Sequence, residues 1–192
     1  MQKWLKPDTR AVLLEERLIG YLDPGAERFL RSMNEPPKLY TTSSCTGRIT
    51  VVEGRFHWLR DGARIVYKTH THITVYELKR VLSRPFKDLW LKATGPIVHL
   101  RAATIDCALQ VLDASRRAGF KHSGIISRGV EGFTVEVMSS LQLHAPLRIE
   151  GEDLYSPEAL ESLVALANQI LEEGWRRLEE LSTAVPTLEN CY

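Results

Sequence analysis

The sequence predicts an α+β protein: a mixed, mostly antiparallel sheet with packed helices, a non-Rossmann arrangement that ends in a long C-terminal helix. Short β-prone stretches such as Leu39–Thr42 and Ile49–Val52 predict strands. Residues 104–118 and 157–181 instead place apolar side chains at helical spacing, the second over about seven turns. No glycine-rich strand-to-helix loop of the dinucleotide-binding kind occurs, which argues against a Rossmann fold.

Length and composition predict one compact domain over residues 1–185, followed by a loose tail at 186–192. With 44% hydrophobic residues among 192, the chain can bury an ordinary core. It has no apolar run of transmembrane length, and its start lacks the apolar region of a signal peptide. The 3 cysteines are far apart and odd in number, which argues against a disulfide framework and predicts a cytoplasmic protein.

Charge is unevenly distributed although the whole chain carries only +1. Residues 46–128 hold 15 basic and 6 acidic side chains, whereas residues 129–192 hold 3 basic and 12 acidic ones. A basic middle can bind nucleic acid, and equally the two parts can neutralise each other in the fold.

Two helices are predicted before the first strand. Apolar residues at helical spacing between Ala11 and Ile19 predict the first helix. Asp23 followed by Pro24 predicts the N-cap of a second helix, which runs to about Met33.

The stretch Leu39–Ile49 places hydroxyl groups, a thiol, a glycine and an arginine between two apolar ends. Its polar centre is predicted to be a tight turn between two strands, with Gly47 at positive φ. Hydroxyl groups and backbone N–H groups suit a polar ligand, and Arg48 can bind a carboxylate or phosphate. The alternative is a turn whose side chains satisfy only their own backbone.

Gly47–Glu53 and Arg64–Lys68 predict a hairpin, and Thr74–Leu82 predicts a short helix. Between them, His70 and His72 would point the same way on an extended segment. Such a pair can bind a metal ion, but no third ligand is identifiable.

Asp88–Lys92 is the second informative stretch. As a strand it would place Asp88, Trp90 and Lys92 on one face, offering a carboxylate, a stacking surface and a cation. That face suits a base with a nearby phosphate. The alternative is a half-exposed strand with an ion pair to its neighbour.

Ile97–Ala102 is the next predicted strand, and on it His99 and Arg101 share a face. An imidazole beside an arginine can bind a ligand or transfer a proton. After the helix at 104–118, Ser123 and Gly124 lead into further strands at about Phe133–Met138 and Leu141–Ile149.

The sequence contains three motifs in this order: Ser43–Arg48, Asp88–Lys92, and Ala118–Phe120 followed by Ser123–Ile125. Together they resemble the wybutosine-synthesis methyltransferase family in its archaeal branch, over a likeness that runs from about Asp23 to Asn168. The residues that carry the family pattern are Ser43, Ser44, Cys45, Gly47, Arg48, Asp88, Trp90, Lys92, His99, Gly119, Ser123 and Gly124.

The resemblance implies a tRNA-modifying enzyme that uses S-adenosylmethionine and binds the anticodon arm of phenylalanine tRNA. The family methylates a ring nitrogen of the tricyclic wyosine-type guanosine 3′ of the anticodon. It implies no metal ion and no Rossmann fold. Eukaryotic relatives tend to have Phe-Glu-Pro where this chain has Lys92–Pro96, so the exact substrate can differ.

Roles for individual residues follow from the resemblance together with the chemistry. Asp88 is the candidate catalytic base, because a ring nitrogen that bears a proton must lose it. Candidates for binding the cofactor are Ser43, Ser44, Cys45, Gly47, Ser123 and Gly124. Candidates for binding the substrate are Arg48, Trp90, Lys92, His99 and Arg101.

Two rival classes remain, a non-catalytic RNA-binding module and a metal-dependent enzyme that uses His70 and His72. Calorimetry with S-adenosylmethionine tests the first alternative, because a simple RNA-binding module would show no binding. Metal analysis of the purified protein tests the second.

Overall fold

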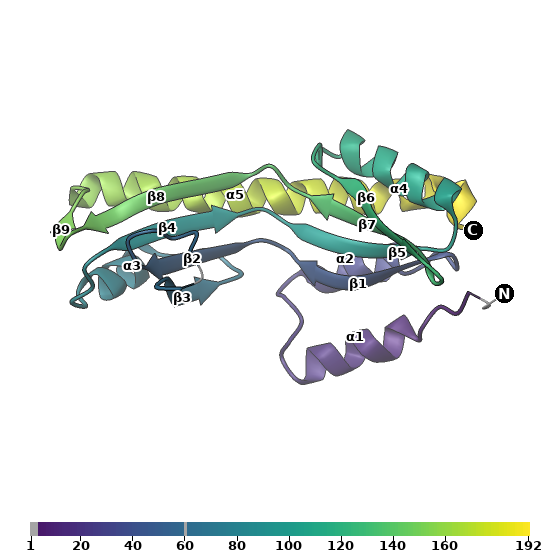
Figure 1. Cartoon of the computed structure of the whole chain (residues 1–192), viewed down its shortest axis with the longest axis horizontal. Coiled ribbons are helices and arrows are strands. Elements are labelled where there is room, and N and C mark those ends of the chain that lie inside the picture. Colours follow the sequence, from purple (N-terminus) through teal and green to yellow (C-terminus); the bar gives the residue numbers. More distant parts are fainter. Residues whose placement is uncertain (1–3, 60) are drawn as a thin grey trace. The chain divides into compact units, whose positions relative to one another are not determined.

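The computed structural model describes residues 4–59 and 61–192. Its contacts gather into two compact units, whereas the sequence predicts a single compact domain. The first unit contains the residues up to Thr46, Pro96–Ser140 and Gly174–Tyr192, and the second contains Gly47–Gly95 and Leu141–Glu173. Each unit has its own sheet, and the long helix α5 (Pro157–Ala184) supplies residues to both (Figure 1).

The sheet of the first unit has four strands in the order β1-β5-β7-β6. These strands are β1 (Leu39–Cys45), β5 (Ile97–Ala102), β7 (Gly132–Met138) and β6 (Gly124–Gly129). All their pairings are antiparallel. Alternate side chains of a strand point to opposite faces, so one face of this sheet is apolar and the other is polar.

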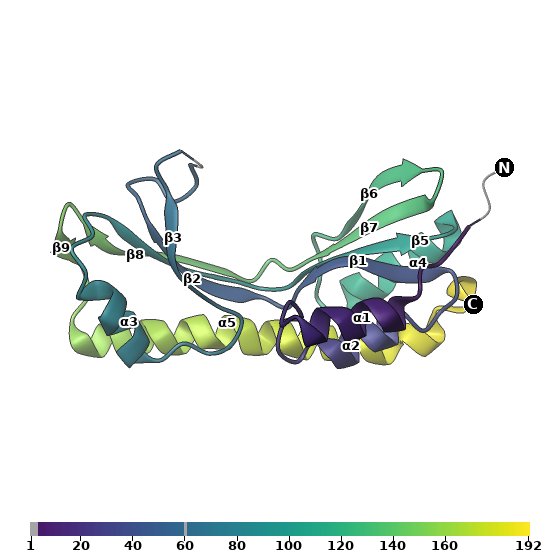
Figure 2. The ribbon, with the colours of Figure 1, turned by 90° about the horizontal axis from the view of Figure 1, so that it is seen from below.

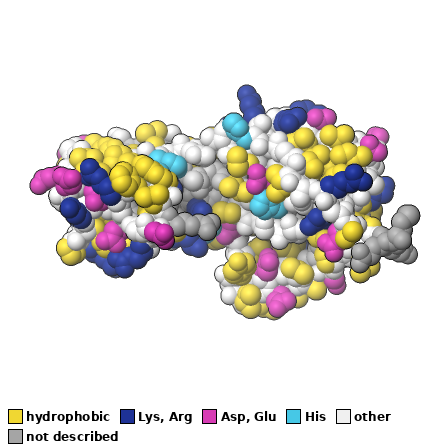
Figure 3. Space-filling view, viewed as in Figure 1, with side chains coloured by type: hydrophobic (Ala, Val, Ile, Leu, Met, Phe, Trp, Pro, Cys, Tyr) yellow, Lys and Arg dark blue, Asp and Glu magenta, His cyan; other side chains and the backbone are white. Residues whose placement is uncertain are grey.

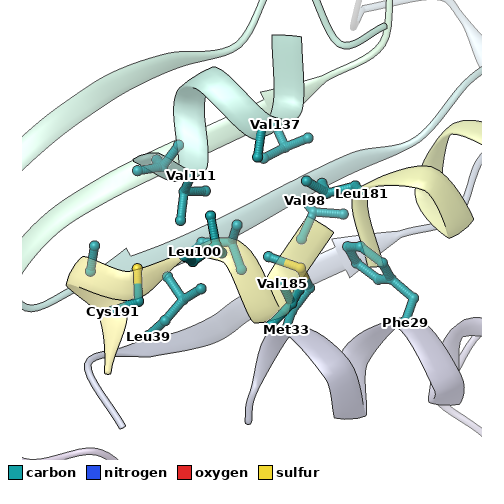
Figure 4. Close-up of a cluster of buried hydrophobic side chains, with 14 of the residues drawn as sticks. Phe29, Met33, Leu39, Val98, Leu100, Val111, Val137, Leu181, Val185 and Cys191 are labelled. Atoms are coloured by element: carbon teal, nitrogen blue, oxygen red, sulfur yellow. The ribbon is translucent and has the colours of Figure 1, made fainter. Parts of the chain in front are cut away.

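Helices cover only the apolar face of the first sheet. They are α2 (Ala26–Met33), α4 (Ile105–Arg117) and the last turns of α5, and α1 (Thr9–Leu18) packs through Leu13. Buried side chains of these helices and of the strands form one core, shown in Figure 4. The core includes Phe29, Met33, Leu39, Leu100, Val111, Val137 and Leu181.

A disulfide joins Cys107 of α4 to Cys191 near the C-terminus, across 84 residues of sequence. The last residues form two short 3₁₀ helices, Val185–Thr187 and Glu189–Cys191, and Leu188 is buried. Two sequence-based predictions are therefore wrong: the tail is packed, and the cysteines do form a disulfide. Their wide spacing concealed it because proximity arises from the fold.

The sheet of the second unit has the strand order β3-β2-β4-β8-β9, again with only antiparallel pairs in the described residues. The strands are β2 (Arg48–Glu53), β3 (Arg64–Thr69), β4 (Leu89–Thr94), β8 (Gln142–Ile149) and β9 (Glu152–Asp153). The predicted hairpin of β2 and β3 is confirmed.

One face of the second sheet packs on α3 (Val75–Leu82) and on the first turns of α5. Thr74 and Glu77 form a capping box that fixes the start of α3. The loop between β2 and β3 lies on the opposite side of the sheet from these helices (Figure 2).

The predicted α+β class, the antiparallel pairing and the long C-terminal helix are confirmed. The predicted tight connection between two strands, with Gly47 at positive φ, is confirmed. It is shorter than Ser43–Arg48, because β1 extends to Cys45 and only Thr46 and Gly47 connect it to β2 of the other sheet. Asp23 does not cap α2, whose N-cap is Gly25. None of the helices within residues 4–59 and 61–192 is long and apolar enough to cross a membrane.

Candidate active site

The link between β1 and β2 is held by Asp23 and shaped by Gly47. Oδ2 of Asp23 accepts hydrogen bonds from the backbone N–H of Thr46 at 2.8 Å and from its hydroxyl at 3.2 Å. Gly47 has a φ of +108°, and an added Cβ would lie 3.0 Å from the carbonyl oxygen of Thr94. Glycine is therefore needed at this position for its backbone.

One row of residues crosses the open, polar face of the first sheet. Ser43, His99, Glu136 and Gly124 stand in register on its four strands. Oγ of Ser43 lies 2.8 Å from Nδ1 of His99, and Nε2 of His99 lies 2.9 Å from Oε2 of Glu136. A Cβ at Gly124 would meet nothing within 4 Å, so that end of the row is open.

These two contacts select one neutral form of the His99 imidazole. A carboxylate only accepts, so Nε2–H donates to Glu136 and Nδ1 accepts the hydroxyl proton of Ser43. The exposed oxygen of Ser43 keeps its lone pairs for a ligand. Ser43 can therefore accept a proton from a ligand while it passes its own hydroxyl proton to His99. The carboxylate of Glu136 would stabilise the imidazolium that forms.

Arg101 lies in the neighbouring row, in register with Tyr40 and Thr134. Its Nε is buried, and within the described part of the chain it has no hydrogen-bond partner. A buried donor without a partner costs free energy, and an anionic ligand would satisfy it.

A cavity of about 450 Å³ lies beside β1 in the same unit. Ser43, Ser44 and Tyr40 line it, together with the carboxylates of Glu16 and Asp23. This volume falls within the roughly 300–1,000 Å³ of small-molecule sites. Hydroxyl acceptors and carboxylates suit a ligand that carries ammonium and hydroxyl groups.

The remaining predicted cofactor residues have other surroundings. Cys45 pairs with Ile97 at the end of β1. Ser123 is buried, and its Oγ accepts the backbone N–H of Met138 at 3.1 Å, so its hydroxyl supports the fold. Gly124 belongs to the row of Ser43 and does not line the cavity.

The second sheet also has a face that its helices leave open. A row of polar side chains crosses it, formed in register by Lys68, Thr50, Lys92 and His144. The next row is Ile65, Val52, Trp90 and Pro146. Arg48 is exposed at the start of β2. Trp90 and Lys92 thus lie in neighbouring rows, and Arg48 and Lys92 line one cavity.

The loop between β2 and β3 places His57 over this face. Its ring centroid lies 4.5 Å from that of Trp90 and 5.0 Å from those of Trp58 and His144. Trp90 is half-buried beneath His57, and within the described residues its Nε1 has no hydrogen-bond partner. Trp58 is the outer ring, with 63% of its surface exposed.

Positive charge in this cluster resides on Arg48 and Lys92. Burial lowers the pKa of Lys92, and repulsion from Arg48 lowers it further. Burial, followed by repulsion from Lys92, also lowers the pKa of His57 and of His144. Because both pKa values lie below the ordinary value of about 6.5, both imidazoles are neutral at pH 7.

Asp88 lies one residue before β4. It is buried, and its Oδ1 accepts from the guanidinium of Arg55 at 3.3 Å and from the backbone N–H of Glu150 at 3.0 Å. These contacts tie the start of β4 to the end of β8. Its carboxylate is thus engaged by Arg55 and Glu150, and Asp88 does not line the cavity of Arg48 and Lys92.

His70 and His72 have separate partners. Nδ1 of His70 lies 2.9 Å from the carbonyl oxygen of Gly47, and Nε2 of His72 lies 3.0 Å from Oε1 of Glu172. The two imidazoles therefore contact different groups, and metal analysis of the purified protein remains the test of the metal-dependent alternative.

Sequence reasoning missed Glu136, His57 and His144. Glu136 interrupts the apolar strand β7, and that polar residue was the available signal. Its pairing with His99 required the register of two strands 37 residues apart. His57 lies in a loop, where no periodicity indicates which side chain folds back.

A family model described as Methyltransferase TYW3 matches residues 5–187. A relative from Aeropyrum pernix is 52% identical over 182 residues, which cover 94% of this chain and 97% of the relative. Its name is tRNA(Phe) 7-((3-amino-3-carboxypropyl)-4-demethylwyosine(37)-N(4))-methyltransferase. A relative of the same name from Saccharolobus solfataricus is 34% identical over 183 residues, or 93% of this chain and 86% of the relative.

Solved structures agree with the fold. A hypothetical protein from Aeropyrum pernix superposes with a TM-score of 0.80 at 48% identity, covering 86% of this chain and 98% of that one. The PH1069 protein from Pyrococcus horikoshii has a TM-score of 0.84 at 27% identity, with coverage of 93% and 92%.

Proposed function

The chain belongs to the Methyltransferase TYW3 family, and on that basis we propose that it methylates the N4 ring nitrogen of 7-(3-amino-3-carboxypropyl)-4-demethylwyosine at position 37 of phenylalanine tRNA. One observation carries this proposal: a relative named for this reaction is 52% identical over 94% of the chain. The reaction needs a methyl donor, a means of holding the modified base, and a group that accepts a proton.

S-adenosylmethionine is the proposed donor, because its sulfonium supplies a methyl carbon that a nitrogen lone pair can attack. The cavity beside β1 fits such a molecule in size and in chemistry. Asp23 and Glu16 suit its ammonium or ribose hydroxyls, and the hydroxyl of Ser44 suits its carboxylate.

The row of Ser43, His99 and Glu136 is the proposed proton acceptor. The N4 proton passes to Oγ of Ser43 while the hydroxyl proton of Ser43 passes to Nδ1 of His99. Glu136 would stabilise the imidazolium formed. The lone pair left on the ring nitrogen would be free to take the methyl group, and the carbon–sulfur bond of the bound donor would break to leave a neutral thioether. This geometry favours His99 over Asp88, whose carboxylate already holds Arg55 and the backbone of Glu150.

Arg48 and Lys92 are the proposed partners of substrate anions. The modified base in the relative's name carries a carboxypropyl group, and the tRNA backbone carries phosphates. Both cations lie at a cavity of the second unit that no acidic side chain lines. A guanidinium and an ammonium are the usual partners of carboxylate and phosphate oxygens. The anticodon arm and a cytoplasmic location remain predictions.

Methyl transfer to purified tRNA tests the proposal. Phenylalanine tRNA from a strain that lacks this gene should gain one labelled methyl group at position 37 from S-adenosylmethionine. The same tRNA from the parent strain, already methylated, is the control and should gain none. No transfer to the demethylated tRNA would contradict the proposal, and calorimetry would then show whether the protein binds the donor at all.

A further inference from the structure

The loop between β2 and β3 exposes two aromatic rings that nothing in the described structure covers. Phe56 and Trp58 have 48% and 63% of their surfaces exposed, and their ring centroids lie 5.2 Å apart. Leu59 and Ile65 beside them are also exposed. Figure 3 shows hydrophobic side chains gathered over the part of the second unit where β2 and β3 lie. Exposed apolar patches of this kind mark binding surfaces.

His57 and the underlying strand β4 support the aromatic side chains of this loop. His57 packs between Trp58 and Trp90, with ring centroids 5.0 and 4.5 Å away, and it also contacts His144. Trp90 in turn belongs to the strand β4. The outer ring of Trp58 is thus supported by a second ring and by the sheet, which lowers the entropy cost of binding on it.

Positive charge surrounds the rings. A cavity of about 200 Å³ next to Trp58 is lined by Arg48, Thr50 and Lys92 and by no acidic side chain. Lys68 stands in register with Thr50 on the same face. The cavity is smaller than the roughly 300–1,000 Å³ of whole small-molecule sites, so it suits a phosphate or a sugar rather than a complete ligand.

An exposed tryptophan beside unneutralised cations has the chemistry of a single-stranded nucleotide site. The ring stacks on a base, and the cations bind the adjacent phosphates. A base within a duplex is already stacked on both sides, so only an unpaired nucleotide offers a free face to Trp58.

We infer that residues 54–59 of the loop between β2 and β3, through Phe56 and Trp58, bind an unpaired nucleotide of the tRNA anticodon loop, with Arg48 and Lys92 on its phosphate. This inference rests on the proposed function for the identity of the RNA. It assigns Trp90 to supporting the loop from within the sheet. The base of the unpaired nucleotide stacks on Trp58 and not on Trp90.

The test compares variants by fluorescence anisotropy with a labelled RNA hairpin that has the sequence of the anticodon arm. Trp58→Ala should weaken binding about 5- to 150-fold, the range for loss of one base–aromatic stack, and Trp58→Phe should keep most of the affinity. Tyr76→Ala is the matched control, because Tyr76 is an exposed aromatic residue of the same unit on α3. Its affinity should equal that of the wild type.

A second arm uses the same stem closed into a continuous duplex. Trp58→Ala should not weaken binding to this duplex, which offers no unpaired base. Lys92→Gln should reduce the slope of log affinity against log salt by about 1 for the hairpin. Equal affinity of Trp58→Ala and Tyr76→Ala for the hairpin would overturn the inference.

Failure of the inference and failure of the proposed function are separable. If the wild type methylates the tRNA and Trp58→Ala binds it normally, only the inference fails. If the wild type binds the hairpin through Trp58 but transfers no methyl group, only the proposed function fails. A change in the sedimentation of the free protein on Trp58→Ala would show instead that a second copy covers the rings, which also overturns the inference.

Discussion

At the scale of single residues, the carboxylates of Glu136 and Asp88 have different roles. Glu136 accepts a hydrogen bond from an imidazole whose other nitrogen faces an exposed hydroxyl. Asp88 instead accepts from a guanidinium and from a backbone N–H. The first arrangement can move a proton, and the second holds two strand ends together.

This difference predicts opposite results for two conservative changes. His99→Gln keeps the size of the side chain but cannot accept a proton, so single-turnover methylation should slow by about 10²-fold or more. Asp88→Asn should keep the methylation rate while lowering the melting temperature, because its ionic contact to Arg55 is lost. Rapid-quench methylation and calorimetric melting measure the two effects.

If Asp88→Asn slowed methylation and His99→Gln did not, Asp88 rather than His99 would be the catalytic base. Glu136→Gln provides an internal check, because it keeps an acceptor for Nε2–H but removes the charge that stabilises the imidazolium. It should slow methylation less than His99→Gln while leaving tRNA affinity unchanged.

His57 makes stability depend on pH. An unfolded imidazole has a pKa of about 6.5, and burial followed by repulsion from Lys92 lowers the pKa of His57 in the fold. The unfolded chain therefore binds the proton more tightly, and stability should fall as the pH falls through about 6.5. Melting temperatures between about pH 7.5 and 5.5 should drop less in His57→Gln than in the wild type.

His122→Gln is the control for this measurement, because its side chain is exposed between α4 and β6. It should follow the wild-type curve. Identical curves for His57→Gln and the wild type would show that burial of His57 has no effect on its titration.

At the scale of elements, the link from β1 to β2 depends on one backbone conformation. Gly47→Ala should destabilise the protein by about 1–3 kcal/mol, because a Cβ at a φ of +108° would lie 3.0 Å from the carbonyl of Thr94. For a chain of this size the melting temperature falls by about 2–4 °C per kcal/mol. Gly129→Ala in β6 is the control, since a Cβ there meets nothing within 4 Å.

At the scale of the whole molecule, the disulfide between Cys107 and Cys191 closes a loop of 84 residues. In the chain-entropy treatment such a loop stabilises the fold by about 4–5 kcal/mol. Thiol titration of the denatured, unreduced protein should find one thiol that reacts, that of Cys45, which is outside the disulfide. Reduction should lower the melting temperature markedly, whereas Cys45→Ser should leave the fall on reduction unchanged. Three free thiols in the unreduced protein would contradict the disulfide.

The sequence alone determined the elements whose causes are local. The stretch Thr74–Leu82 and the apolar spacing of residues 104–118 and 157–181 predict helices that the structure contains as α3, α4 and α5. The alternation around Leu89 and Leu91 likewise predicts β4 with one buried face. The residue types of the motif Ser43–Arg48, which are unusual for a strand, also pointed to the region of the proposed site.

Only the tertiary structure decided which residues meet. Asp23 appeared to be a helix cap but holds Thr46, and the thiols of Cys107 and Cys191 appeared unrelated but are bonded. The physical reason is the same in each case. Helix caps and periodicity depend on residues three or four apart, whereas strand register, loop position and disulfide pairing depend on which distant segments share a core. The row of Ser43, His99 and Glu136 therefore exists only once β1, β5 and β7 are paired.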